Sequence, residues 1–256
     1  MNSRNNRVCI CVGHGKSENG GYDPGAVSGG YHEFEIAKEI AKLTAEEIRK
    51  SGIGCDLINA DGGLYLTERI SSANAGGYAL AVEVHLNAGG GTGTEVYHSK
   101  FSSEGKTAAG LVSAAVSQAL GVKNRGAKIR LNSKGKDYFA FIRQTTMTAI
   151  LIETVFIDTP SDLQKVTERD GVKTCAAAIA GAIKNLIDPV PETKLRYEII
   201  CHSLTVRSGP SSSYAAVGYM GKGEVVTVTE TAGSKWGKIG KGWISLNEKY
   251  VRLSRR

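Results

Sequence analysis

Along residues 1–187, short apolar runs alternate with segments whose apolar positions recur at helical spacing. The apolar runs, which predict buried strands, lie at residues 7–12, 53–58, 79–86 and 148–157. The amphipathic patterns, which predict helices, lie at residues 33–51, 66–75, 105–120 and 172–187. Strands that alternate with helices favour an α/β domain, with a mostly parallel twisted sheet flanked by helices.

The pattern changes at residues 188–194, DPVPETK. Its two prolines cannot continue the preceding helix, so this stretch is a predicted linker. Residues 195–256 contain short alternating runs between Gly, Ser and Pro turns, and no helical pattern. They predict a small all-β barrel, so we expect two domains, at residues 1–187 and 195–256.

Composition describes an ordinary globular chain, with 41% hydrophobic and 22% charged residues. No segment approaches the roughly 18 consecutive apolar residues of a membrane helix, so we expect no stable membrane association. The N-terminal stretch lacks the apolar centre of a secretory signal. We therefore expect a protein that is made in the cytoplasm without a signal peptide.

The chain has five cysteines, an odd number, and none forms a C-x-x-C pair. This argues against a disulfide framework and against a thiolate zinc site. We expect buried free thiols at Cys9, Cys11, Cys55, Cys175 and Cys201.

The net charge of +7 is unevenly distributed. Residues 1–194 carry 22 Lys+Arg against 21 Asp+Glu, whereas residues 195–256 carry 10 against 4. A basic second domain favours an anionic partner. Nucleic acid, a membrane surface and the anionic polymers of a bacterial wall all satisfy this criterion on charge alone.

His14 follows the first apolar run and lies between Gly13 and Gly15. Open α/β sheets place their sites at the carboxyl ends of strands, and flanking glycines let the chain turn there. A turn histidine without a role is the alternative. The GKS at residues 15–17 matches the end of a phosphate-binding loop, but Ile10 occupies the position of that motif's first glycine and no helix pattern follows. A nucleotide site is therefore excluded.

His85 repeats this placement, at the end of a second apolar run before a glycine-rich loop. Two such histidines favour a metal pair, for which zinc is the usual ion when a carboxylate completes the set. Glu33 is the first residue of the first predicted helix. A favourable interaction of its charge with the helix dipole would explain a carboxylate at this position equally well. On composition, His32 and Glu35 are also possible ligands.

Glu153 lies within the apolar run AILIETVF. A buried carboxylate is costly unless it has a strong partner or faces an open cleft. Two interpretations follow: a structural ion pair with Lys or Arg, or a carboxylate of raised pKa beside a metal-activated water.

These motifs occur in a defined order along residues 7–187. They are GHG at 13–15, DPGAV at 23–27, an acidic residue opening a helix, LTERISSANAGGYALAVEVHLNA at 66–88, NRGAK at 124–128, and a glutamate in an apolar strand. The combination resembles the zinc-dependent N-acetylmuramoyl-L-alanine amidases of bacteriophage endolysin type. Departures from that pattern are the Lys-Ser after GHG and the threonine after Glu153.

The resemblance implies that His14, Glu33 and His85 hold Zn²⁺ and that Glu153 is the catalytic carboxylate. It implies hydrolysis of the amide between N-acetylmuramic acid and L-alanine in peptidoglycan. Glu33, rather than Glu35, has the family's distance from the DPGAV segment.

The same resemblance makes Arg69 and Asn87, within the matching stretch, the expected substrate-binding residues. A zinc carboxypeptidase or deacetylase with similar ligands is a competing enzyme class. A non-enzymatic protein that binds the wall or nucleic acid through its basic tail is the competing class without catalysis.

The segments at residues 204–228 and 242–253 resemble bacterial SH3-type domains. This resemblance implies that residues 195–256 bind the bacterial cell wall, and we expect no nucleic acid partner. Tyr197, Tyr214, Tyr219 and Trp236 are candidates for the binding surface, whereas Trp243 is expected in the core. Together the domains predict an endolysin that stays in the host cytoplasm until its release causes lysis. A host autolysin with the same chemistry is the alternative.

Overall fold

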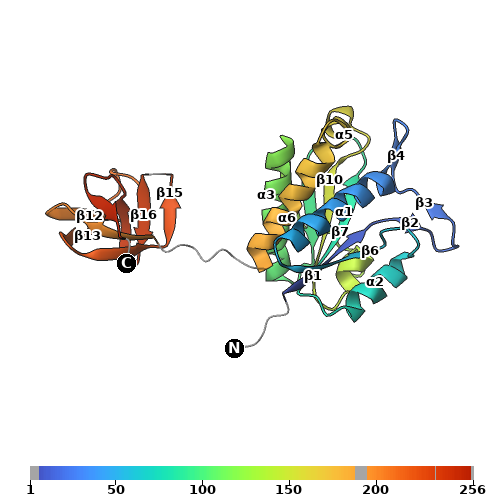
Figure 1. Ribbon diagram of the computed structural model, residues 1–256, viewed down its shortest axis with the longest axis horizontal. Coiled ribbons are helices and arrows are strands. Elements are labelled where there is room, and N and C mark those ends of the chain that lie inside the picture. Colours follow the sequence, from blue (N-terminus) through green and yellow to red (C-terminus); the bar gives the residue numbers. More distant parts are fainter. Residues whose placement is uncertain (1–5, 188–194, 234, 255–256) are drawn as a thin grey trace. The chain divides into compact units, whose positions relative to one another are not determined.

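The computed structural model describes residues 6–187, 195–233 and 235–254. The chain divides into two compact units, Met1–Asp188 and Pro189–Arg256, which are drawn in Figure 1. The expected linker at residues 188–194 lies outside the described residues. Each unit is therefore considered by itself.

The first unit is built on a six-stranded sheet in the order β6-β1-β7-β10-β8-β9. Its strands are β1 (Arg7–Val12), β6 (Gly54–Ile58), β7 (Leu80–Asn87), β8 (Thr94–His98), β9 (Asn124–Lys128) and β10 (Thr148–Phe156). Every pairing is parallel except that of β10 with β8. The expected α/β class with a mostly parallel sheet is therefore confirmed.

Helices cover both faces of this sheet (Figure 1). They are α1 (Glu33–Lys50), α2 (Leu66–Ala75), α3 (Ser103–Leu120), α4 (Ala140–Gln144), α5 (Pro160–Thr167) and α6 (Gly171–Ile187). The helices α1, α3 and α6 share one hydrophobic cluster with the sheet, and α2 and α4 share another on the opposite face. None of the helices in the described ranges combines the length and apolar character needed to cross a bilayer.

Burial on both faces explains why β1 reads as a continuous apolar run. Val8, Ile10 and Val12 belong to the cluster under α1, α3 and α6, whereas Cys9 and Cys11 belong to the cluster under α2 and α4. All five cysteines are free thiols, as expected. Four are buried, whereas Cys201, which was also expected to be buried, is partly exposed.

Several elements lie outside the sequence expectations. Two short hairpins connect β1 to α1: β2 (Gly15–Lys16) with β3 (Tyr22–Asp23), and β4 (Val27–Ser28) with β5 (Tyr31–His32). The strands β8 and β9 and the helices α4 and α5 are also additional. The strands are only five residues long, and Glu95 and Arg125 interrupt any apolar run in them.

In the described part of the second unit every element is a strand, and every pairing is antiparallel. One sheet contains β14 (Val225–Val228), β11 (Leu195–Ile199) and β18 (Val251–Leu253). The other contains β13 (Ala216–Gly221), β12 (Ser203–Arg207), β17 (Gly242–Ser245), β16 (Trp236–Ile239) and β15 (Glu230–Ala232). They enclose one small core, and the expected all-β domain is confirmed.

The expectation that Trp243 lies in this core is wrong. Its neighbour Ile244 is fully buried, and because side chains alternate along a strand, Trp243 takes the outer face. There it stays partly exposed, with the Lys238 ammonium 5.7 Å from the centre of its ring.

Candidate metal and catalytic site

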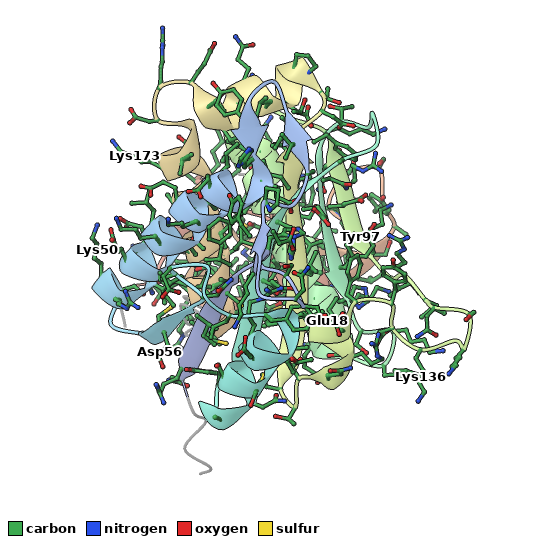
Figure 2. All side chains as sticks on the ribbon, turned by 90° about the vertical axis from the view of Figure 1, so that its right-hand side faces the viewer. Glu18, Lys50, Asp56, Tyr97, Lys136 and Lys173 are labelled. Atoms are coloured by element: carbon green, nitrogen blue, oxygen red, sulfur yellow. The ribbon has the colours of Figure 1, made fainter. Side chains whose placement is uncertain are left out.

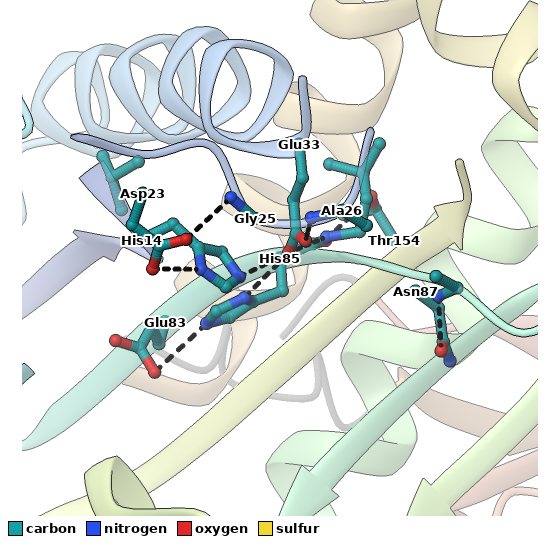
Figure 3. A network of polar contacts seen from close by, with 12 residues as sticks. His14, Asp23, Gly25, Ala26, Glu33, Glu83, His85, Asn87 and Thr154 are labelled. Atoms are coloured by element: carbon teal, nitrogen blue, oxygen red, sulfur yellow. Dashed lines mark hydrogen bonds and ion pairs between the residues drawn. The ribbon is translucent and has the colours of Figure 1, made fainter. Parts of the chain in front are cut away.

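Three side chains that are far apart in the sequence converge at the carboxyl ends of the central strands. His14 follows β1, Glu33 is the first residue of α1 and His85 lies near the end of β7. One potential ligand atom from each lies within 4.8 Å of the others. Figure 3 shows the three side chains pointing toward one another. Over the described parts of the chain, no other such group of three is found.

The donor atoms of this cluster are spaced as metal ligands are. Glu33 Oε1 lies 2.9 Å from His85 Nδ1 and 3.2 Å from His14 Nε2. The edge of a tetrahedron with Zn–N bonds of 2.0–2.1 Å is about 3.3 Å long. The two imidazole rings meet edge to face, with interplanar angle 81°. Two imidazoles and one carboxylate form a donor set that suits zinc, so the residues present fit a divalent ion.

The backbone at His14 has an uncommon conformation that its neighbours stabilise. His14 has φ 63°, in the left-handed region that costs energy for a residue other than glycine. Its carbonyl accepts hydrogen bonds from Asn59 Nδ2 at 2.8 Å and from Arg69 Nη1 at 3.1 Å. Gly13 is required beside it, since a Cβ there would lie 2.2 Å from the His85 ring. These contacts fix the direction of the His14 imidazole.

Asp23 fixes the rotation of the same ring. Its Oδ2 lies 2.9 Å from His14 Nδ1, and its Oδ1 accepts a hydrogen bond from the Gly25 amide at 3.0 Å. Burial alone would raise the pKa of Asp23, but the bonds from His14 and Gly25 outweigh it and lower that pKa. An ionised carboxylate on Nδ1 leaves Nε2 of His14 directed at Glu33 and available to an ion.

Glu33 is only 3% exposed, and it is nevertheless held in its ionised form. Its Oε2 accepts a hydrogen bond from the Ala26 amide at 2.8 Å, and its Oε1 accepts one from the Leu86 amide at 3.0 Å. Burial opposes ionisation, but hydrogen bonds and charges from His14 and His85 outweigh it and keep the pKa well below its usual range. A carboxylate that is ionised at neutral pH is what a metal ligand requires.

The His85 ring contacts a buried ion pair, which is formed by Glu83 and Arg69. Its Nε2 lies 3.3 Å from Glu83 Oε2, and Glu83 Oε1 is 3.2 Å from Arg69 Nε. Burial lowers the pKa of His85, but the carboxylates of Glu33 and Glu83 outweigh it and raise that pKa well above its usual value. The contact with Glu83 turns Nδ1 of the ring toward Glu33.

Glu153 lies beside this cluster, in β10. It pairs in register with His85 on one neighbouring strand and with Glu95 on the other. Its Oε2 is buried without a hydrogen-bond partner, and it lines the same cavity as His14 and His85. Burial raises the pKa of Glu153 to about 7, against the lowering effect of the His85 charge. This environment favours the interpretation as a proton carrier over that of a structural ion pair.

The two expected substrate-binding residues also line the cavity, but both have partners within the protein. Arg69 is only 5% exposed, and its guanidinium bonds Glu83 and the carbonyl of His14. Asn87 Nδ2 donates to Glu95 Oε1 at 2.8 Å. Their contact with substrate stays a prediction.

The alternative ligands His32 and Glu35 lie outside the cluster. His32 Nδ1 and Glu35 Oε1 each lie 3.3 Å from the hydroxyl of Tyr22. The second of these contacts is a hydrogen bond donated by that hydroxyl. Of the three residues near the start of α1, only Glu33 therefore reaches the two histidines.

Sequence reasoning missed Asp23, Asn59 and Glu83 as supporting residues. The alternation of β7 contains a signal for Glu83, because Glu83 and His85 must point to the same side of the strand. Asp23 lies in the DPGAV phrase without any pattern that joins it to His14. For Asn59, the only signal is its place at the end of an apolar strand.

This arrangement defines a class of protein. An α/β unit presents ligands for one divalent ion at its strand ends and, in the same cavity, a carboxylate able to carry a proton. These are the parts of a hydrolase site.

Comparison with known protein families agrees with a hydrolase. The family described as N-acetylmuramoyl-L-alanine amidase matches residues 8–185, and bacterial SH3 domains match residues 202–252. The chain belongs to the N-acetylmuramoyl-L-alanine amidase family.

Individual relatives cover mainly the first unit. The sporulation-specific N-acetylmuramoyl-L-alanine amidase of Bacillus subtilis is 29% identical over 182 residues, 70% of this chain and 67% of that protein. The endolysin of Bacillus phage SPP1 is 28% identical over 190 residues, 71% of this chain and 66% of that protein. The structure of Cwp6 from Clostridium difficile superposes with a TM-score of 0.67 at 32% identity, over 73% of this chain. The match makes up only 30% of the Cwp6 chain.

Proposed function

We propose that this chain is a zinc-dependent endolysin that hydrolyses the amide between N-acetylmuramic acid and L-alanine in peptidoglycan. The observation that carries the proposal is the convergence of His14, Glu33 and His85 beside the Glu153 carboxylate, whose Oε2 is buried. Membership in the amidase family indicates which bond is cleaved.

In this proposal His14 and His85 would hold the zinc through Nε2 and Nδ1, and Glu33 would hold it through Oε1. When bound, such an ion polarises the scissile carbonyl and makes a nearby water a nucleophile at neutral pH. Asp23 and Glu83 keep the two imidazoles oriented toward Glu33, which reduces the reorganisation that binding requires.

Glu153 carries the proton. The Glu153 carboxylate accepts a proton from the attacking water as the new C–O bond forms at the lactyl carbonyl. It then gives that proton to the departing nitrogen of L-alanine as the C–N bond breaks. A carboxyl group with a pKa near 7 can both accept and donate a proton at neutral pH.

The second unit would hold the enzyme on its polymer. Residues 195–256 carry most of the excess positive charge, and bacterial walls contain anionic polymers. The outer face of its larger sheet bears Tyr219, 68% exposed, and a row in which Arg207, Trp243 and Lys238 are neighbours. An aromatic and basic face of this kind suits a ligand with sugar or peptide groups and negative charge.

The endolysin relative of phage SPP1 supports a lytic role after release from the host cytoplasm. The sporulation amidase of Bacillus subtilis favours the alternative, an autolysin of the bacterium itself. Expression inside a host cell separates the two. An endolysin should leave cells intact until a membrane-lesion protein is co-expressed, whereas an autolysin should lyse or remodel walls without one.

The chemistry is tested with purified protein and purified walls. We expect turbidity to fall and new L-alanine amino termini to appear, a chelator to stop both and zinc to restore them. His85→Ala should lose both the bound metal and the activity. Release of acetate would identify a deacetylase, and wall binding without lysis would identify a binding protein.

A further inference from the structure

Residues 129–139, between β9 and α4, form an arm beside the catalytic cavity. The arm is a hairpin: Leu131 and Asp137 form an antiparallel bridge, and the Tyr138 amide donates to the Arg130 carbonyl at 2.8 Å. In Figure 2 the segment with Lys136 projects away from the body of the first unit. The base of the arm therefore places the side chains of Arg130 and Tyr138 next to one another.

Buried polar contacts anchor this base. The Asp137 carboxylate is 6% exposed, and it accepts hydrogen bonds from Ser99 Oγ at 2.7 Å and from the Lys100 amide at 3.0 Å. The Arg143 guanidinium donates to the carbonyls of Asp137 and Tyr138, at 2.6 and 2.7 Å. A base held at so many points presents its side chains in a defined geometry.

Arg130 has stacking contacts in place of an ion pair. Its guanidinium carbon lies 3.9 Å from the centre of the Tyr138 ring and 5.9 Å from that of Phe139. Within the described residues, no carboxylate or carbonyl forms a hydrogen bond or ion pair with this guanidinium. Stacking occupies the face of the group and leaves the N–H donors on its edge available.

Other cations in or near the cavity differ from Arg130, because they already form ion pairs. Three of them are paired with carboxylates: Lys16 with Glu68 at 3.1 Å, Arg69 with Glu83 at 3.2 Å, and Arg125 with Glu95 at 2.6 Å. Their charges are therefore already compensated within the protein. Arg130 keeps a charge that an incoming anion can neutralise.

Aromatic contacts connect Arg130 to the reacting centre. Phe139 lines the cavity that contains Glu153, and its ring centre lies 4.7 Å from that of Tyr97. Burial and Glu95 raise the pKa of Tyr97 most; the charge of Glu153 raises it further and that of Arg130 lowers it. Arg130 is itself exposed and does not line the cavity, but it neighbours Phe139, which does.

We propose that Arg130 is a specificity-determining residue, which binds a carboxylate of the peptide attached to the scissile amide. The inference rests on the proposed amidase function, because that reaction places a peptide in this cavity. A guanidinium presents two parallel N–H donors that match the two oxygens of a carboxylate, and stacking on Tyr138 holds that fork in place.

The test compares two soluble substrates, a muramoyl peptide with free carboxylates and the same compound with carboxamides in their place. We expect Arg130→Gln to lower kcat/KM for the free acid about tenfold or more, mainly through KM, since hydrogen bonds between charged groups are stronger than those between neutral ones. Its kcat/KM for the carboxamide should hardly change. Arg130→Lys keeps the charge without the fork and should fall between.

Lys134→Gln is the matched control, because it removes one positive charge from the turn of the same arm. It should leave the ratio of the two kcat/KM values at the wild-type level. An equal loss on both substrates in Arg130→Gln, or no loss on either, would overturn the proposal. Wild-type protein that cleaves neither substrate would instead contradict the amidase function. Thermal unfolding checks that each variant is folded, and Arg130→Lys serves if the Gln variant is not.

Discussion

At the scale of residues, the site depends on neighbours whose importance no sequence pattern shows. His14 keeps its strained backbone because Asn59 and Arg69 hold its carbonyl. Glu33 is fixed by the amide of Ala26, in the preceding loop, and by the amide of Leu86, which is far from it in the sequence. Once the fold has brought these groups together, forming the contacts costs little further free energy. The contacts set the directions of the donor atoms.

Glu153→Ala should separate chemistry from metal binding. Glu153 is outside the ligand cluster, so the variant should fold and bind metal in the wild-type ratio. Loss of the proton carrier should lower kcat by about 10²–10⁴. Metal content per chain and the rate of amide hydrolysis are the measurements, and a fully active variant would remove Glu153 from the mechanism.

Gly25→Ala should damage the metal site through a single methyl group. A Cβ at Gly25 would lie 2.6 Å from Glu33 Oε2 and 2.7 Å from the His14 ring. We expect reduced metal content and activity. Gly20→Ala is the control, since Gly20 has a similar positive φ of 86° but open space around it. It should cost only about 1–2 kcal/mol of backbone strain and keep its metal. Equal metal loss in both variants would show that backbone conformation, not space, is responsible.

Arg69→Met tests whether Arg69 supports the fold or binds substrate. The change removes the arginine partner of the buried Glu83 and leaves it only the contact with His85, which should lower the free energy of unfolding by about 3–5 kcal/mol. Urea denaturation gives this value. A second change, Glu83→Met, should recover part of it by removing the charge that has lost its arginine partner. Unchanged stability with a raised KM would instead support the substrate-binding role that the resemblance suggested.

At the scale of elements, the apolar strands and amphipathic helices were the predictable part. β1, β6, β7 and β10 lie between helices, so their sequences are mostly apolar. β8 and β9 lie at one side of the sheet, and their polar residues serve local partners, as Glu95 and Arg125 do in pairing with each other. Neither segment forms an apolar run that would predict a strand, and only pairing with β10 reveals the antiparallel direction of β8.

Two carboxylates hold the glycine-rich loop that follows β7, one from α5 and one from the turn before it. The sequence did not predict α5. Asp162, 2% exposed, accepts hydrogen bonds from Thr92 Oγ1 at 2.6 Å and from the Gly93 amide at 2.7 Å. Asp158, exposed, accepts from the amides of Gly89 and Gly90 at 2.7 and 2.9 Å. Two carboxylates thus hold the same loop, one from inside and one from the surface.

We expect Asp162→Ala to destabilise the protein more than Asp158→Ala. Buried donors left without an acceptor cost about 1–3 kcal/mol each, whereas exposed amides recover their bonds from water. Chemical denaturation of the two variants measures the difference. Equal losses would mean that water reaches the inside of the loop.

At the scale of the whole molecule, charge and chemistry are divided between two units. If the basic second unit holds the enzyme on an anionic wall, binding to purified walls should weaken as salt rises from about 0.1 M to 1 M, where the screening length falls from about 10 Å to 3 Å. Turnover of a small soluble substrate should change much less. Sedimentation with walls and product release are the two measurements, and salt-independent binding would exclude charge as its main cause.

The sequence by itself determined the alternation of strands and helices, the all-β second unit and the order of the site motifs, because burial and turn geometry constrain residue types locally. Its resemblance to a known family also picked out the four central residues that the fold brings together. Tertiary structure alone decided which carboxylates and amides orient the histidines, and which arginine next to a cavity-lining residue keeps its charge without an ion pair. Those partners are chosen by contact between distant segments, and a contact of that kind leaves no periodic signal along the chain.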